Sequence, residues 1–361
     1  MSASLLIIAL SGRFIAQQAV AEGYHVNIID RYGDRDTLAL CQQWRPLPEA
    51  DIEVLLEAIV QLSSPHCQLI YGPGIESFYP VLSRLPSSVT VLGNRLQTIQ
   101  ACQTARFFQY LTRLNIAYPE THQQRLPYPV SRYWLQKSYT GFGGRHITPA
   151  RNRTVSQQHY FQRRYDGVSF SALIVANQKD YRLLTLQQSF STTNTACSPF
   201  QFLGLRSGYV LSHEHYHQLQ RWLLLLVQQF QLIGINSIDL LLTAKQQQLL
   251  LLEINPRISA SVQLLKDIPW LDWHRQACQQ KVLPNIKINL NPQRQLHTIY
   301  SDQKFTVAKA VNWPAYAADL PSAEQVILPN QPICSLITDT DLSFQLNHYR
   351  QQKMILSLCQ P

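Results

Sequence analysis

Three polar residues in the second half of the chain have the types and the spacing of a metal site. Glu253 and Asn255 stand two apart at the end of the apolar run Gln248 to Ile254, so in a strand their side chains leave the same face. The polar stretch Lys245 to Gln248 predicts a hairpin turn that places Asp239 opposite Glu253. Carboxylate and amide oxygens are ligands that Mg²⁺ takes together with phosphates. The sequence therefore predicts a magnesium site at Asp239, Glu253 and Asn255.

The same hairpin predicts how its apolar side chains pack. The leucines expected on the face away from the polar groups are Leu240, Leu242, Leu250 and Leu252. An apolar strand has little reason to hold a carboxylate at its end unless that carboxylate has a partner. The alternative is a strand end that emerges into solvent, with Pro256 ending the ladder.

A second group of residues could bind phosphate. Lys137 closes a predicted strand, Arg132 to Lys137, and the loop Gly141-Phe142-Gly143-Gly144 follows. Glycines let backbone N–H groups approach phosphate oxygens, and a lysine supplies a point charge. Such a loop alone is more often a plain turn; its position upstream of the metal strand in the same predicted domain gives it meaning.

The elements that must position these groups follow an α/β order. A strand at 4–10, a turn at Ser11-Gly12-Arg13, a helix at 14–23 and a strand at 24–29 ending at Asp30 predict a parallel sheet. Further on we expect helices at 101–114 and 212–232, and strands at 160–165, 169–175, 237–242 and 248–254. We place domains at 1–94 (α/β), 95–284 (two lobes, hinge near 160–167) and 285–361 (a small C-terminal subdomain with short strands).

The order of these motifs resembles the ATP-grasp superfamily, whose biotin-carboxylase-like members it matches over nearly the whole chain. The segment Glu-Ile-Asn-Pro-Arg-Ile-Ser-Ala-Ser at 253–261 carries the resemblance most specifically. The resemblance implies an α/β and α+β fold, with a Rossmann-like domain before a two-lobed ATP clamp. It also implies an ATP- and Mg²⁺-dependent ligase that joins a small-molecule carboxylate to an amine through an acyl phosphate.

The resemblance further implies a role for individual residues. Asp239, Glu253 and Asn255 would hold Mg²⁺, Lys137 with the loop Gly141, Gly143 and Gly144 would contact the phosphates, and Arg257 would neutralise the transferring phosphoryl group and the acyl phosphate. Gln162 would lie in the hinge strand, with the backbone of Arg163 and Tyr165 at the adenine. The family's usual lysine aligns near Thr104, where Arg106 is the available replacement. The hinge arginines Arg163 and Arg164 and Ser138 after Lys137 also depart from the pattern.

The C-terminal part resembles a subgroup of these ligases associated with methanofuran or tetrahydromethanopterin biosynthesis in methylotrophs. The residues concerned are Trp313-Pro314, Asp319-Leu-Pro321 and Asn330 to Cys334. A ligase that joins glutamate to tyrosine or tyramine would suit that setting.

Composition excludes several other classes of protein. The net charge of +9 favours anionic ligands such as nucleotides, but no cluster of Lys and Arg with interleaved aromatics indicates nucleic acid. Seven scattered cysteines without a CxxC pair argue against disulfides and zinc and for a reducing compartment. No apolar run approaches the length of a membrane span. We expect a cytoplasmic protein without a membrane partner; a homo-oligomer stays open.

Two other functions remain as alternatives. The opening strand–turn–helix with Asp30 could belong to an NAD(P)-dependent oxidoreductase, although its turn has one glycine in place of GxGxxG. A non-catalytic nucleotide-binding sensor is the other, because of Thr104. His213 and His217 have the spacing of metal ligands but are more typical of an exposed helix start, and Ser259 and Ser261 could contact substrate or cap the next helix. Cys334 has no histidine placed beside it to activate it as a nucleophile.

Overall fold

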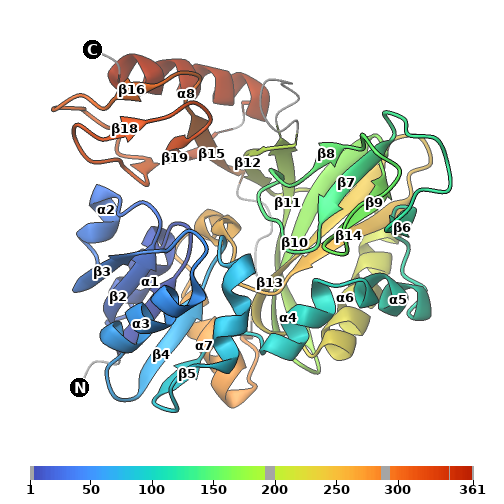
Figure 1. The fold of residues 1–361 in the computed structure, drawn as a ribbon, viewed down its shortest axis with the longest axis horizontal. Helices are drawn as coiled ribbons and strands as arrows, with labels where there is room; N and C mark the ends of the chain where they lie inside the picture. The colour runs from blue at the N-terminus through green and yellow to red at the C-terminus, as the bar shows by residue number, and fades with distance from the viewer. Residues whose placement is uncertain (1–3, 192–199, 286–292, 341, 360–361) are drawn as a thin grey trace.

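The computed structural model describes residues 4–191, 200–285, 293–340 and 342–359. Figure 1 shows three parts: an N-terminal α/β part, a two-lobed middle part and a C-terminal part that lies above the first. The fold is mixed α/β, as predicted from the sequence, with a parallel sheet first and antiparallel sheets after it.

The elements follow the chain in this order. The N-terminal part comprises β1 (Ser4–Ile8), α1 (Arg13–Ala21), β2 (His25–Asp30), α2 (Arg35–Leu38), β3 (Gln43–Pro46), α3 (Ile52–Leu62), β4 (Cys67–Tyr71), the 3₁₀ helix η1 (Glu76–Ser83) and β5 (Val89–Val91). The middle part comprises α4 (Leu96–Cys102), α5 (Arg106–Arg113), β6 (Thr121–Gln123), β7 (Trp134–Ser138), β8 (Thr148–Pro149), β9 (His159–Arg163), β10 (Gly167–Asn177), β11 (Tyr181–Ser191), β12 (Phe202–Ser207), α6 (His213–Phe230), β13 (Ile233–Thr243), β14 (Leu249–Asn255), η2 (Ala260–Leu264) and α7 (Trp270–Gln280). The C-terminal part comprises β15 (Arg294–Tyr300), β16 (Phe305–Thr306), β17 (Ala317–Ala318), β18 (Val326–Ile327), β19 (Pro332–Asp339) and α8 (Phe344–Cys359).

The N-terminal sheet is parallel, with strand order β3-β2-β1-β4-β5. Successive residues of β1 feed two different cores, Leu5 and Ile7 on one face and Leu6 and Ile8 on the other. A strand buried on both faces explains the unbroken apolar run in the sequence. The strand order reverses between β1 and β4, so the turns after these two strands form the crevice where open α/β sheets bind ligands.

The middle part contains a small antiparallel sheet and most of a larger one. The smaller sheet has the order β6-β9-β7-β8, and the larger has the order β14-β13-β10-β11-β12-β15-β19-β17. Residues 164–166 connect β9 of one sheet to β10 of the other, which is where the sequence predicts a hinge.

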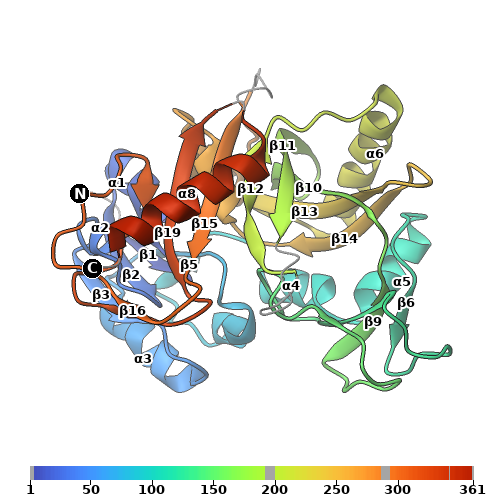
Figure 2. The same ribbon diagram turned by 90° about the horizontal axis from the view of Figure 1, so that it is seen from above.

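The large sheet continues into the C-terminal part. β12 pairs with β15, and β15 in turn pairs with β19, so hydrogen bonds run across the domain boundary expected near residue 285. Helix α8 lies over these strands (Figure 2). The domain boundaries stay predictions, and one continuous hydrogen-bonded sheet spans the predicted boundary between the last two domains.

The helix predicted at 101–114 is wrong as one helix. The structure has α4 and α5, separated by residues 103–105. Cys102 and Phe107 both face the core under α6. In one straight helix, residues five apart point about 140° away from each other, so the break allows both to be buried.

α7 ties the N-terminal part to the large sheet. Its residue His274 is 2% exposed, accepts a hydrogen bond from Ile235 N at Nδ1 (2.9 Å), and bonds the Leu92 carbonyl through Nε2 (3.1 Å). Ile235 belongs to β13 and Leu92 follows β5, so one neutral imidazole joins the two sheets. Among the described residues no helix is both long and apolar enough to cross a membrane.

This junction predicts a dependence of stability on pH. Burial lowers the pKa of His274 to about 4. Between pH 6.5 and 4 this histidine is therefore protonated in the unfolded chain but neutral in the folded protein. The free energy of unfolding should therefore fall as the pH decreases from 6.5 to 4, by about 3 kcal/mol for this group. Chemical denaturation of His274→Asn at several pH values should show a shallower decline in the free energy of unfolding, because asparagine takes up no proton in this pH range. His66→Asn, at an exposed turn with positive φ, is the control. An equally steep decline in His274→Asn would contradict the assignment.

Candidate functional site

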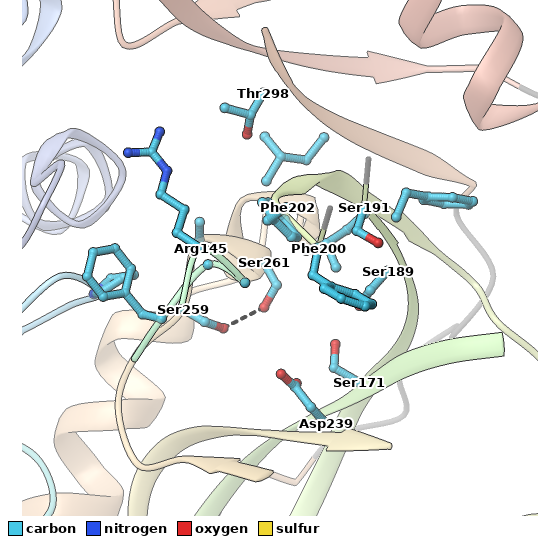
Figure 3. A pocket seen from close by; sticks show the side chains of 18 of the residues that line it. Arg145, Ser171, Ser189, Ser191, Phe200, Phe202, Asp239, Ser259, Ser261 and Thr298 are labelled. Atoms are coloured by element: carbon cyan, nitrogen blue, oxygen red, sulfur yellow. Dashed lines mark hydrogen bonds between the residues drawn. The ribbon is translucent and has the colours of Figure 1, made fainter. Parts of the chain in front are cut away.

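A cavity of about 1120 Å³ lies where the three parts of the chain meet. The N-terminal part lines it with the turns after β1 and β2, the small sheet with β7 and β9, and the large sheet with β10, β11, β13 and β14. Figure 3 shows side chains that line the cavity. Asp239 and Ser171 lie at the bottom of the view, and Arg145 and Thr298 lie above them.

The β13–β14 hairpin places the predicted metal ligands together. Asp239 pairs with Glu253 and Ser237 with Asn255 in the antiparallel register, as the turn position predicts. Asn255 Nδ2 lies 3.1 Å from Asp239 Oδ2 and 3.5 Å from Glu253 Oε1. All three side chains line the cavity, so the predicted convergence is confirmed as geometry.

The predicted packing of the leucines is wrong for half of them. Leu240 is buried in the core with Leu242 against it, but their partners there are Leu249 and Leu251, in place of Leu250 and Leu252. A β-bulge between Asp239 and Leu240 explains the shift, because the register passes from Asp239↔Glu253 to Leu240↔Leu251. Leu252 is the extra residue, and it lines the cavity. Leu251 N donates to the Ala117 carbonyl (2.8 Å).

The two carboxylates repel each other at the wall of the cavity. Burial, and then the charge of Glu253, raise the pKa of Asp239 to about 8. Burial alone would also raise the pKa of Glu253, but Lys137 and then His146 hold it below the ordinary value. Glu253 is therefore the charged partner, and Asp239 keeps its proton at neutral pH. Ser237 Oγ donates to Asp239 Oδ1 (3.2 Å) and orients it.

Lys137 stands near this pair from the small sheet. It is 5% exposed, and its Nζ donates to Gln162 Oε1 (3.0 Å) on the neighbouring strand β9. Burial lowers the pKa of Lys137, while the charges of Glu253 and Asp239 act to raise it. The small sheet thus presents a buried amine, fixed by an amide, near two carboxylates of the large sheet.

Arg257 is anchored by a residue that the sequence analysis did not find. Its Nε pairs with Glu76 Oε1 (2.8 Å), and both side chains are buried. Its Nη2 donates to Asn255 Oδ1 (3.1 Å). Burial acts to lower the pKa of Arg257, but the nearby Glu76 raises it, so the guanidinium stays charged. Glu76 follows the turn after β4, and an acid just past the carboxyl end of a parallel strand is the signal that could have found it.

The glycine loop packs against β12 at one end and against a histidine at the other. Gly143 and Gly144 line the cavity, and the Gly143 carbonyl accepts from Phe202 N (3.1 Å). Gly141 lies outside the lining; a Cβ there would come 1.9 Å from the ring of His146. His146 was also missed by the sequence analysis, and burial lowers its pKa although Glu253 opposes this.

The structure brings the predicted hinge residues to the cavity but leaves one predicted residue outside. Gln162, Arg163 and Tyr165 all line the cavity. The Arg163 N–H already donates to the Glu120 carbonyl (2.8 Å). Arg106 is exposed at the start of α5 and, within the described chain, does not belong to the lining, so the structure does not bring it to the place of the missing lysine.

Five other candidate residues have simple outcomes. Ser259 and Ser261 line the cavity and bond each other (2.6 Å), and Ser259 makes no side-chain cap to η2. His213 and His217 contact each other at an exposed helix start (2.9 Å). Asp30 is fully buried and accepts from Gly12 N, Gly33 N and Trp44 Nε1, so its oxygens hold the first turn together. A dinucleotide ribose would need one of those oxygens, so Asp30 does not favour the oxidoreductase alternative.

Comparison with known proteins defines the class of fold. Residues 103–261 match the family profile described as an ATP-grasp domain. The chain has the ATP-grasp fold, as the sequence predicts. A search of curated protein sequences finds no significant match.

Solved structures with this fold cover the chain from end to end. The biotin carboxylase domain of 2-oxoglutarate carboxylase from Hydrogenobacter thermophilus, in complex with MgADP, ADP and bicarbonate, has a TM-score of 0.72 at 12% identity, over 98% of this chain and 90% of that one. The L-amino acid ligase from Bacillus licheniformis has a TM-score of 0.69 at 15% identity, over 99% and 98%. N5-carboxyaminoimidazole synthase from Aspergillus clavatus, with ADP and its ribonucleotide, has a TM-score of 0.68 at 14% identity, over 99% of both chains. The C-terminal part is therefore included in the shared fold.

The glycine loop yields a prediction about local stability. Gly143 and Gly144 both have positive φ, so an alanine at either costs about 1 kcal/mol in backbone strain. At Gly144 the new Cβ would also fall 1.8 Å from the Phe200 carbonyl oxygen, whereas nothing lies within 4 Å at Gly143. Gly144→Ala should therefore be cleaved faster by protease between residues 139 and 147 than its matched control Gly143→Ala. Equal cleavage rates would show that the loop does not pack on Phe200.

Proposed function

We propose that the protein is an ATP-dependent ligase that forms a carbon–nitrogen bond. The reaction takes a carboxylate, an amine and ATP to an amide, ADP and phosphate. The observation that carries the proposal is the convergence of Asp239, Glu253 and Asn255 on one cavity with Lys137. The ATP-grasp fold supports it, because the neighbours with this fold include a carboxylase and an amino acid ligase.

The residues present fit a magnesium ion. Asp239 and Glu253 are adjacent carboxylates, and the pKa of Asp239 is raised to about 8. A bound cation would stabilise both in the charged form. The Asn255 amide N–H bridges both carboxylates, and a rotated amide would offer its oxygen as a third ligand. Within the described residues no group of three His, Cys, Asp or Glu could hold a metal, so the third protein ligand would be neutral. When bound, Mg²⁺ would neutralise phosphate oxygens and polarise the phosphorus.

The remaining residues would position and protect the substrates. Lys137, held by Gln162, would pair with phosphate oxygens, and the N–H groups of Gly143 and Gly144 would approach the same phosphates. Gln162, Arg163 and Tyr165 would surround the adenine at the hinge. Arg257, fixed by Glu76, would hold the substrate carboxylate and later the tetrahedral oxyanion. The fold places the cavity between three parts of the chain, which helps to keep water from an acyl phosphate.

The finer form of the proposal concerns the substrates. The residues that suggest a role in methanofuran or tetrahydromethanopterin synthesis include Asp319 to Pro321, and Asp319 and Pro321 line the cavity. Asp319 also bonds Ser11 Oγ and Arg13 Nε of the N-terminal part. Glutamate with tyrosine or tyramine is the first pair of substrates to test by ADP release.

A substitution at the metal site tests the proposed reaction. Glu253→Gln keeps the shape of the side chain but removes the carboxylate charge that we propose binds Mg²⁺. Substrate-dependent ADP release should therefore fall by about a hundredfold or more. The fold should stay intact because the amide keeps the shape of the side chain, although the attraction to Lys137 and His146 that lowers the pKa of Glu253 is lost. Glu57→Gln, on the exposed face of α3, is the control. Nearly wild-type ADP release by Glu253→Gln would sink the metal assignment.

A further inference from the structure

One carboxylate at the N-terminal end of the cavity has no partner. Asp34 is 5% exposed and lines the cavity just after β2. It occupies the position before α2 but makes no capping hydrogen bond. Within the described parts of the chain its side chain makes neither a hydrogen bond nor an ion pair. A buried carboxylate without a partner is costly, so its retention calls for a ligand.

The carboxylates around Asp34 are all satisfied by the protein itself. Asp30 accepts three N–H bonds, as described above. Asp36 accepts from the backbone N–H groups of Asp319 and Leu320 (2.8 and 2.9 Å). Asp319 accepts from Ser11 Oγ and Arg13 Nε (2.8 and 2.9 Å). Asp34 therefore differs from these neighbours, because its carboxylate oxygens lie at the cavity and accept no hydrogen bond from the described residues.

Three arginines near this end of the cavity have other partners. Arg13 pairs with Asp319 and donates to Gln17 and Gln263. Arg31 pairs with Glu49, and Arg145 donates to the Asn330 carbonyl. Burial, with the charges of Asp319, Asp30 and Asp36, raises the pKa of Asp34 to about 8, and Arg13 opposes this only in part. Without a cation Asp34 therefore keeps its proton at neutral pH, and a bound cation would allow it to ionise.

We propose that Asp34 binds the ammonium group of the amine-bearing substrate. This rests on the proposed ligase function and names one half of its substrate pair by chemical class. An organic ammonium fits better than a metal ion, because the neighbouring carboxylate oxygens already accept hydrogen bonds and, among the described residues, no cluster of three metal-binding side chains occurs. The same cavity connects Asp34 with Asp239, Glu253 and Arg257, so an amine bound there shares a compartment with the activating groups.

Calorimetry and thermal shift on the full chain test this inference. The probes are the proteinogenic L-amino acids and simple primary amines, each compared with its N-acetyl derivative, which lacks the ammonium charge. We expect at least one free amine to stabilise the wild-type protein, its N-acetyl derivative to have no effect, and Asp34→Asn to bind that amine about tenfold more weakly or worse. If no amine stabilises the wild type, or if Asp34→Asn binds the amine as tightly, the inference is wrong.

Two controls separate this role from a structural one and from the ligase proposal. Asp51→Asn also removes a negative charge from the N-terminal part, at an exposed helix cap where asparagine serves as well, and should bind the amine normally. Asp34→Asn without ligand should be as stable as wild type or more so; a marked loss would assign Asp34 a structural role and overturn the proposal. Asp34→Asn should still be stabilised by MgADP, whereas Glu253→Gln should lose that effect and keep its affinity for the amine. Failure of the MgADP arm alone would count against the ligase proposal and not against Asp34.

Discussion

The site depends on the pairing of β13 with β14, which places two carboxylates side by side at the wall of a cavity. Such a pair is unfavourable in itself, because burial and mutual repulsion raise the pKa of Asp239 to about 8. The backbone ladder and the leucines behind it hold the pair in place. The β-bulge lets the same short strand bury Leu251 on one face and present Glu253 on the other. The hairpin therefore stores an electrostatic cost that a divalent cation can relieve.

The other contacts of the site come from parts of the chain far apart in sequence. Glu76 of the N-terminal part fixes Arg257, and Gln162 of the small sheet fixes Lys137. Arg13 and Ser11 bond Asp319 of the C-terminal part. Arg257, Lys137 and Asp319 are thus each held by a partner on another element, so their positions at the cavity depend on the assembly of all three parts. The proposed ammonium site at Asp34 lies at one of these junctions.

The sequence predicted the local part of this arrangement well. The turn position placed Asp239 opposite Glu253, and an unbroken apolar run marked β1 as a strand buried on both faces. It could not place the bulge, since one extra residue in a run of leucines leaves no pattern, and so Leu250 and Leu252 were assigned to the wrong face. The break between α4 and α5 was missed for a related reason, because residues 103–105 include neither glycine nor proline. Glu76, His146 and Asp34 acquire meaning only from tertiary contacts, which no local spacing encodes. Arg106 lies close to Thr104 in sequence, but the structure leaves it exposed and outside the cavity lining.

Locating a bound divalent cation tests the proposed metal site most directly. Crystals of the protein grown with Mn²⁺ and a non-hydrolysable ATP analogue would reveal the metal by its anomalous scattering. We predict a peak at about 2.1 Å from side-chain oxygens of Asp239 and Glu253, with the Asn255 amide turned to offer its oxygen. Bound nucleotide with the metal elsewhere, or with Asp239 turned away from it, would contradict the central claim.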